Sequence, residues 1–249
     1  MNDDHDSWDF YPCRVDDRPA SISLNLRWAR EDVPAALDTL YWLRIGMLDP
    51  ADHGMGTAAE AERLHPVEDA ITDGAAKLGL VYVGRLRNDD TWQLVFYGPP
   101  RHEEGLEALT GAAQLDGRAF ETGSKSDPEW SYFQEFLMPD AERHQWMQDR
   151  AVVAALEERG DVVSIPRRVA HWADFPTAAA RQAFVEDAAH AGFALESSSD
   201  REQSFSAQVF RTDTVELGEI HDVVMALIEL AEGHGGEYDG WETSVEKPS

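Results

Sequence analysis

Pairs of neighbouring carboxylates are the residues whose spacing comes nearest to an acid–base site in this chain. Glu103-Glu104 and Glu157-Glu158 would supply a general acid and a general base, or oxygen ligands for a divalent cation. Such catalysis requires that one carboxyl group be buried with a shifted pKa. Because the chain holds 48 acidic residues among 249, neighbouring acids arise by chance, and a solvated face is the favoured interpretation.

Nucleophilic, phosphate-binding and metal-binding motifs are also weak. Cys13 is the single cysteine, so no internal disulfide can form, and its acidic context is expected to raise its pKa. Gly54 and Gly56 lack the further glycines and the preceding strand of a phosphate loop. The nine histidines include no pair at the i, i+4 spacing of metal ligands, which favours structural roles for His171 and His221. We therefore predict a protein that is not an enzyme and that uses no cofactor or metal ion.

Aromatic residues are the more informative group. The chain has eight tryptophans, and four of them are expected at equivalent positions of two similar halves: Trp28, Trp130, Trp172 and Trp241. Most should be core residues, since buried aromatic side chains contribute strongly to small domains. A minority is expected to anchor a partner.

The C-terminal half predicts the element order βαββαβ. The segments are a strand at Val162–Trp172, with Pro166 suggesting an edge or bulge, a helix from the N-cap Thr177 to Gly192, a hairpin turning at Ser197–Asp200, a helix from Leu217, and a strand at Tyr238–Val245. The helix from Leu217 carries the strongest periodic signal, because its apolar residues recur at three- or four-residue steps. The order predicts a four-stranded antiparallel sheet with two helices on one face, a ferredoxin-like arrangement.

The N-terminal half suggests a similar order. Its expected segments are a strand at Ala20–Trp28, an additional helix at about Asp32–Met47, a helix from Pro66 to Gly79, a hairpin turning at Asn88–Asp90, a helix at Glu103–Leu115, and extended segments at Ala119–Thr122 and Trp130–Leu137. The stretch Ala75–Leu80 recurs as Ala188–Phe193, each time before a hairpin. The fold class is therefore predicted as α+β, with two ferredoxin-like βαββαβ domains at residues 1–138 and 161–249, joined by a helix within 139–160.

Composition predicts a cytoplasmic protein that avoids nucleic acid and membranes. The formal net charge is −27, and such a surface repels phosphate backbones. The same field speeds encounter with a basic protein segment, although acidity also serves solubility alone. The N-terminus has no signal-peptide pattern, and the longest apolar run, Val223–Ile228, is too short to span a bilayer. The oligomeric state is not predicted.

Two family resemblances add to this interpretation. The ending Gly235-Gly236-Glu237-Tyr238-Asp239-Gly240-Trp241-Glu242, after a long amphipathic helix, resembles the regulator of ribonuclease activity B over roughly residues 160–248. The N-terminal half, with Trp8, Tyr11 and the stretch Glu129–Phe133, resembles the uncharacterised DUF695 domain family. The first resemblance implies a ferredoxin-like fold and inhibition of ribonuclease E by binding its basic C-terminal region. This chain lacks the long acidic tail of that family and carries an extra domain.

The candidate partner-binding residues are those of the ending itself: Glu237, Tyr238, Asp239, Gly240, Trp241 and Glu242. A structural role competes with direct contact, since Tyr238 and Trp241 can pack the last strand while Asp239 and Gly240 form a bulge or bend. The favoured function is an acidic, non-catalytic regulator that binds a basic segment of a ribonuclease E-like partner. The alternative is an immunity-like or stress-associated protein that neutralises another basic partner.

Overall fold

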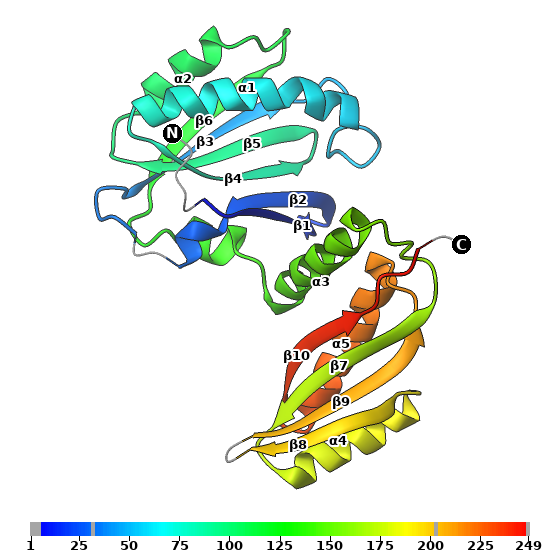
Figure 1. The fold of residues 1–249 in the computed structure, drawn as a ribbon. Helices are drawn as coiled ribbons and strands as arrows, with labels where there is room; N and C mark the ends of the chain where they lie inside the picture. Colours follow the sequence, from blue (N-terminus) through cyan, green and yellow to red (C-terminus); the bar gives the residue numbers. More distant parts are fainter. Residues whose placement is uncertain (1–5, 31–32, 202–203, 248–249) are drawn as a thin grey trace. The chain divides into compact units, whose positions relative to one another are not determined.

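The computed structural model describes residues 6–30, 33–201 and 204–247, drawn as a ribbon in Figure 1. The chain divides into two compact units, Met1–His144 and Gln145–Ser249. Both are α+β, and every strand pairing in both sheets is antiparallel. Within the described residues, no helix combines the length and the apolar character that a membrane span needs.

The N-terminal unit is built on a six-stranded sheet in the order β1-β2-β4-β5-β3-β6. Its strands are β1 Trp8–Val15, β2 Arg18–Asn25, β3 Thr39–Gly46, β4 Val81–Asn88, β5 Thr91–Gly98 and β6 Phe120–Ser126. Its helices are the 3-10 helix η1 Leu26–Ala29, α1 Ala58–Lys77, α2 Glu103–Ala112 and the π-helix η2 Tyr132–Leu137. The segment from β3 to β6 therefore has the order βαββαβ, to which the β1–β2 hairpin is added beside β4.

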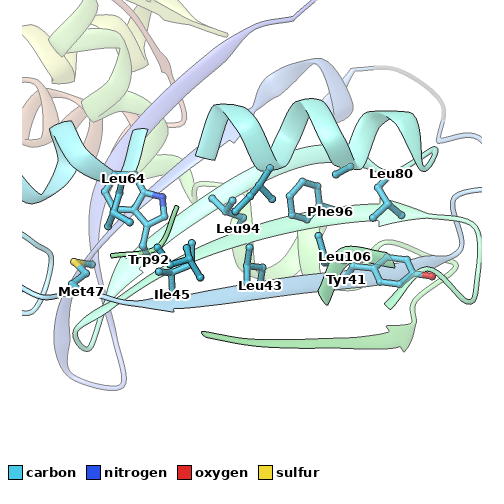
Figure 2. Packing of buried hydrophobic residues seen from close by; sticks show 13 residues of the cluster. Tyr41, Leu43, Ile45, Met47, Leu64, Leu80, Trp92, Leu94, Phe96 and Leu106 are labelled. Carbon is cyan, nitrogen blue, oxygen red and sulfur yellow. The ribbon is translucent and has the colours of Figure 1, made fainter. Parts of the chain in front are cut away.

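Helices α1 and α2 cover one face of this sheet. Figure 2 shows the buried side chains beneath α1, where Leu64 of the helix lies over Trp92 of β5 and Ile45 of β3. The buried strand residues of the cluster come from β3 and β5, and Tyr82 of β4 and Phe120 of β6 pack against them. Its largest members are fully buried, so the cluster supplies most of the apolar burial that fixes the helices on the sheet.

Several N-terminal predictions are wrong, and β3 shows why. The predicted helix at about Asp32–Met47 is instead a strand over Thr39–Gly46, and Asp32 lies outside the described residues. This strand lies inside the sheet between β5 and β6, with Leu43 and Ile45 buried beneath the helices and Arg44 exposed on the other face. Leu40 and Trp42 on that second face are also apolar, so the apolar residues run together in the sequence and hide the alternation that marks a half-buried strand. The first strand of the βαββαβ order is therefore β3, and the predicted strand Ala20–Trp28 belongs to the added hairpin.

Two further boundaries differ from the prediction. Helix α1 begins at Ala58, not at Pro66, because the Thr57 hydroxyl caps it by accepting a hydrogen bond from the Glu60 amide at 3.2 Å. The segment Trp130–Leu137 is not extended. The Asp127 carboxylate accepts hydrogen bonds from the Ser131 and Tyr132 amides, both at 3.0 Å, and starts the turn that leads into η2.

The C-terminal unit contains most of α3, Ala141–Glu158, and a four-stranded sheet in the order β10-β7-β9-β8. The other elements are β7 Arg167–Phe175, α4 Ala178–His190, β8 Ala194–Arg201, β9 Ser204–Asp213, α5 Leu217–Gly233 and β10 Glu237–Thr243. Residues of α4 and α5 pack together on one face of the sheet. This is the βαββαβ order that the sequence predicts.

Most C-terminal details are confirmed. Thr177 caps α4 by accepting from the Ala180 amide at 3.1 Å, Gly192 ends it with a φ of 88°, and α5 begins at Leu217. The predicted turn at Ser197–Asp200 is wrong, because these residues continue β8. Pro166 precedes β7, a central strand that begins at Arg167, so the predicted edge or bulge at Pro166 is also wrong.

The two units share more than their element order. Gly79 and Gly192 both have positive φ, and in each case the following residue donates its amide to the carbonyl five residues earlier, at 3.0 Å. Each following strand then has a register shift, between Tyr82 and Gly84 in β4 and between Leu195 and Ser197 in β8. The recurrence that the sequence suggests around the two glycines is thus present in detail.

The first strands of the two βαββαβ orders also match. Trp42 of β3 lies opposite Gly123 of β6, and Trp172 of β7 lies opposite Gly240 of β10. The tryptophan equivalent to Trp172 is therefore Trp42, whereas Trp28 lies in η1. The equivalence predicted from the sequence is wrong because it starts from the wrong strand.

Candidate partner-binding face of the C-terminal unit

The six candidate residues Glu237, Tyr238, Asp239, Gly240, Trp241 and Glu242 all lie on β10. This strand is at one edge of the four-stranded sheet, and within the part of the chain that the structure describes it pairs with β7 alone. Glu237, Asp239 and Glu242 are exposed, Tyr238 and Gly240 are half-buried, and Trp241 is buried with 9% of its surface exposed. The ending is therefore divided between core and surface.

A β-bulge produces this division. The pairing of β10 with β7 shifts between Tyr238 and Gly240, which leaves Asp239 as the extra residue. In a regular strand, residues three apart point to opposite faces. The extra residue restores the same face for Tyr238 and Trp241, so both pack on the helix side of the sheet. The predicted bulge at Asp239 and Gly240 is confirmed, and Gly240 has a φ of 140° that favours glycine.

Trp241 is tied into the interior by a polar network. Its indole Nε1 donates to Asp149 of α3 at 2.9 Å, and Asp149 itself is fully buried. The same carboxylate accepts from Gln145 at 3.0 Å and lies 2.8 Å from Nδ1 of His221. Three partners satisfy this buried carboxyl group, and the network holds α3, α5 and β10 together. A partner protein would have to break this packing to use Trp241 as an anchor.

Tyr238 is held by a second buried contact. Its hydroxyl lies 2.8 Å from Nδ1 of His171 on β7, and the ring packs against both apolar clusters of the unit. Burial raises the pKa of the Tyr238 phenol well above its ordinary value, with a further contribution from Asp149 and then Asp239. Burial also lowers the pKa of His171 to about 4. Both groups are therefore neutral near pH 7, consistent with a structural role for His171.

The opposite, helix-free face of the sheet carries the polar groups. Asp239 lines a small hollow of about 190 Å³ together with Trp172 and Asp174 of β7 and with serines of β8 and β9. Glu237 pairs with Asp174 in the register, and Glu242 pairs with Ala170, which places both acids on this same face. We call the set formed by Trp172, Asp174, Glu237, Asp239 and Glu242 the open acidic face.

The sequence interpretation names Trp172 among the tryptophans that could be core residues or anchors, but not among the candidate residues of the ending. Its side chain is half-buried, whereas the flanking His171 and Ala173 are buried on the helix side. The alternation of β7 puts Trp172 on the open acidic face, next to the acids of β10. Only the register of β7 against β10 shows which of the C-terminal tryptophans points outward.

The groups considered for catalysis each lie within one of the two units. Burial, and not mainly the acidic context, raises the pKa of Cys13, so its thiolate is disfavoured near pH 7. Gly54 and Gly56 both have positive φ in the loop before α1. Glu103 and Glu104 lie in the first turn of α2, and Glu157 and Glu158 end α3. Among the described residues, no group of three or more potential ligands is arranged to hold a metal ion.

Comparisons with known proteins connect both units to families. A family model described as a family of unknown function, DUF695, matches residues 6–138, which is more than half of the chain. A second model, described as regulator of ribonuclease activity B, matches residues 146–243. A search of curated proteins finds no match.

Two solved structures give weak similarities. One is a putative glycine cleavage system transcriptional repressor, 10% identical, covering 83% of this chain and 98% of its own, with a TM-score of 0.26. The other is an unknown protein from Galdieria sulphuraria, 12% identical, covering 84% and 99%, with a TM-score of 0.25. Neither score supports an argument about this chain, whereas the family models do. The chain belongs to the DUF695 family of unknown function, and its C-terminal unit belongs to the family of the regulator of ribonuclease activity B.

Proposed function

We propose that this protein regulates RNA decay by binding a basic segment of a ribonuclease E-type enzyme through its C-terminal unit, without catalysing a reaction. The match of residues 146–243 to the regulator of ribonuclease activity B carries the proposal. The net charge of −27 supports it, because an acidic surface attracts a basic, extended segment over long distances.

The proposed contact surface includes the candidate residues of β10 in two roles. Glu237, Asp239 and Glu242 would face the partner's cations, and Trp172 would supply the apolar centre of the contact. Tyr238, Gly240 and Trp241 would act by holding β10 in its bulged register. The outer edge of β10 pairs with no strand among the described residues, which also allows an extended segment to add there as a further strand.

The wider role follows from the same proposal. Residues 1–138 and 161–249 would act as separate modules joined through residues 139–160. The protein would work in the cytoplasm with a protein partner, without a cofactor or metal ion, and would not bind RNA directly. A filter-binding assay at about 150 mM salt, a physiological ionic strength, checks the last point.

The test compares two charge-matched triple variants. Glu237→Gln, Asp239→Asn and Glu242→Gln remove three charges from β10, while Asp222→Asn, Glu229→Gln and Glu232→Gln remove three from exposed positions of α5. Affinity for the basic C-terminal region of the host ribonuclease E is measured by calorimetry, beside the rate of RNA cleavage. Because exposed ion pairs contribute about 0.2–1 kcal/mol each, the β10 variant should bind about tenfold more weakly.

The control should change binding less than about twofold. It lowers the net charge by the same amount, but its three charges lie on α5 and salt largely screens them from a partner bound at β10. The unmodified protein should slow cleavage of RNA by the nuclease, and the β10 variant should slow it less. If the unmodified protein neither binds this region nor slows cleavage, the proposed function is wrong.

A further inference from the structure

The N-terminal unit has a groove that its family assignment does not explain. Helix α1 packs on the central strands, and the β1–β2 hairpin continues the sheet on the side of β4 away from β5, as Figure 1 shows. Between the flank of α1 and strands β1, β2 and β4 lies a cavity of about 900 Å³. A groove of this size accommodates several residues of an extended chain.

One wall of the groove is acidic. Asp69 and Asp73 are exposed, lie one turn apart on α1, and have no ion-pair partner among the described residues. The two arginines of the lining already face acids of the lining: Arg85 lies 3.0 Å from Glu68, and Arg27 lies 3.8 Å from Asp6. The groove therefore has four carboxylates and two guanidinium groups, and its uncompensated charge is negative.

The opposite wall presents an exposed aromatic ring. Trp8 of β1 is 41% exposed and packs against Tyr82 with ring centroids 4.8 Å apart. The Tyr82 hydroxyl donates to Glu68 at 2.7 Å, which holds the pair in place. A tryptophan face beside carboxylates suits an arginine or lysine side chain, because the ring attracts the cation while the aliphatic stem covers the ring.

Trp28 adds a second aromatic residue to this lining and is 7% exposed. Its indole Nε1 is closed to solvent, so the groove presents the apolar ring of Trp28 to a ligand and not this donor.

We propose that the groove binds an extended basic peptide segment of a partner protein. Its cationic side chains lie between Trp8 and the two aspartates Asp69 and Asp73. The inference concerns the N-terminal unit alone and does not depend on the function proposed for the C-terminal unit.

The experiment uses the full-length protein and a short labelled peptide of alternating arginine and leucine, followed by fluorescence anisotropy at about 150 mM salt. The groove variant is Asp69→Asn with Asp73→Asn. Its control is Glu104→Gln with Glu107→Gln, which removes the same charge from exposed positions of α2. The groove variant should weaken binding about tenfold and Trp8→Ala about fivefold, whereas the control should change it less than about twofold. The thermal midpoint of each variant shows whether it is folded.

Three outcomes would overturn the proposal. Equal losses in the groove variant and the α2 control would mean that the peptide responds only to overall charge. A peptide with glutamate in place of arginine that binds as tightly would remove the role of the cations. Failure to bind the peptide, with self-association in sedimentation that Trp8→Ala abolishes, would assign the groove to a second copy of this chain.

Discussion

At the scale of single residues, two tryptophans of the C-terminal unit are expected to have different roles, one in the core and one in partner binding. Trp241 is buried and donates to Asp149, so Trp241→Ala should lower the free energy of unfolding by about 3–5 kcal/mol. Trp172 lies on the open acidic face, so Trp172→Ala should leave stability within about 1 kcal/mol and weaken partner binding by about 2–4 kcal/mol. Denaturant titration and calorimetry with the ribonuclease segment measure the two quantities. A Trp241→Ala protein that keeps its stability and loses the partner would instead make Trp241 the anchor.

His171 gives a prediction about pH. Its pKa is about 4 in the folded protein, because of burial, against about 6.5 in an unfolded chain. Between these values the unfolded state binds more protons, so the stability from neutral His171 is complete above pH 6.5 and is lost as pH falls toward 4. The titration of this histidine should lower the free energy of unfolding by about 3 kcal/mol over that window.

The measurement is urea unfolding of the unmodified protein and of His171→Phe between about pH 7.5 and 4.5. As pH falls, the free energy of unfolding of the unmodified protein should decrease more than that of the variant. His190→Gln, at a side chain that is 86% exposed, serves as the control and should follow the unmodified protein. Parallel curves for His171→Phe and the unmodified protein would show that His171 does not drive this part of the pH dependence.

At the scale of elements, the bulge of β10 determines which residues reach the surface. Gly240 has a φ of 140°, so Gly240→Ala should strain the backbone and cost about 1–3 kcal/mol, although space around its Cβ position is open. Gly218→Ala, at an equally open position in α5, should stabilise by about 0.5–1 kcal/mol. Thermal unfolding of the two variants checks the contrast. Equal effects of both substitutions would mean that the backbone of β10 is not restricted at Gly240.

The same bulge explains the composition of the ending. Tyr238 and Trp241 serve the core, and the intervening register shift leaves Glu237, Asp239 and Glu242 on the open acidic face. A strand without the extra residue would bury an acid or expose an aromatic ring. The element thus combines a packed interior with a charged edge in seven residues.

At the scale of the whole molecule, the net charge of −27 should govern how fast a basic partner arrives. Raising salt from about 50 to 300 mM shortens the screening length, so the association rate with the ribonuclease segment should fall steeply. The dissociation rate should change much less, because it depends on contacts that the partner buries, such as the proposed contact with Trp172. Stopped-flow or surface-binding kinetics over this range measure both rates. Association that is independent of salt would exclude electrostatic steering.

Local features of the fold follow from the sequence where neighbouring residues provide the interaction. Thr177 caps α4 with its own hydroxyl, Gly192 supplies a positive φ at the helix end, and the apolar spacing from Leu217 describes a helix buried on one face. The family resemblances of both units are also carried by local stretches of residues, and the family models bear them out.

Features that depend on partners distant in the chain required the tertiary structure. Strand β3 shows little alternation in the sequence, because Leu40 and Trp42 on its open face are as apolar as the residues on its helix side, and this apolar run led to the wrong prediction of a helix. The sequence raised both a structural role and partner contact for Trp241. Pairing with β7, a bulge at Asp239 and the distant carboxylate of Asp149 place Trp241 inside and leave Trp172 outside. Side-chain direction in a strand changes with every one-residue shift, and the shift is set by pairing between strands that lie more than 60 residues apart.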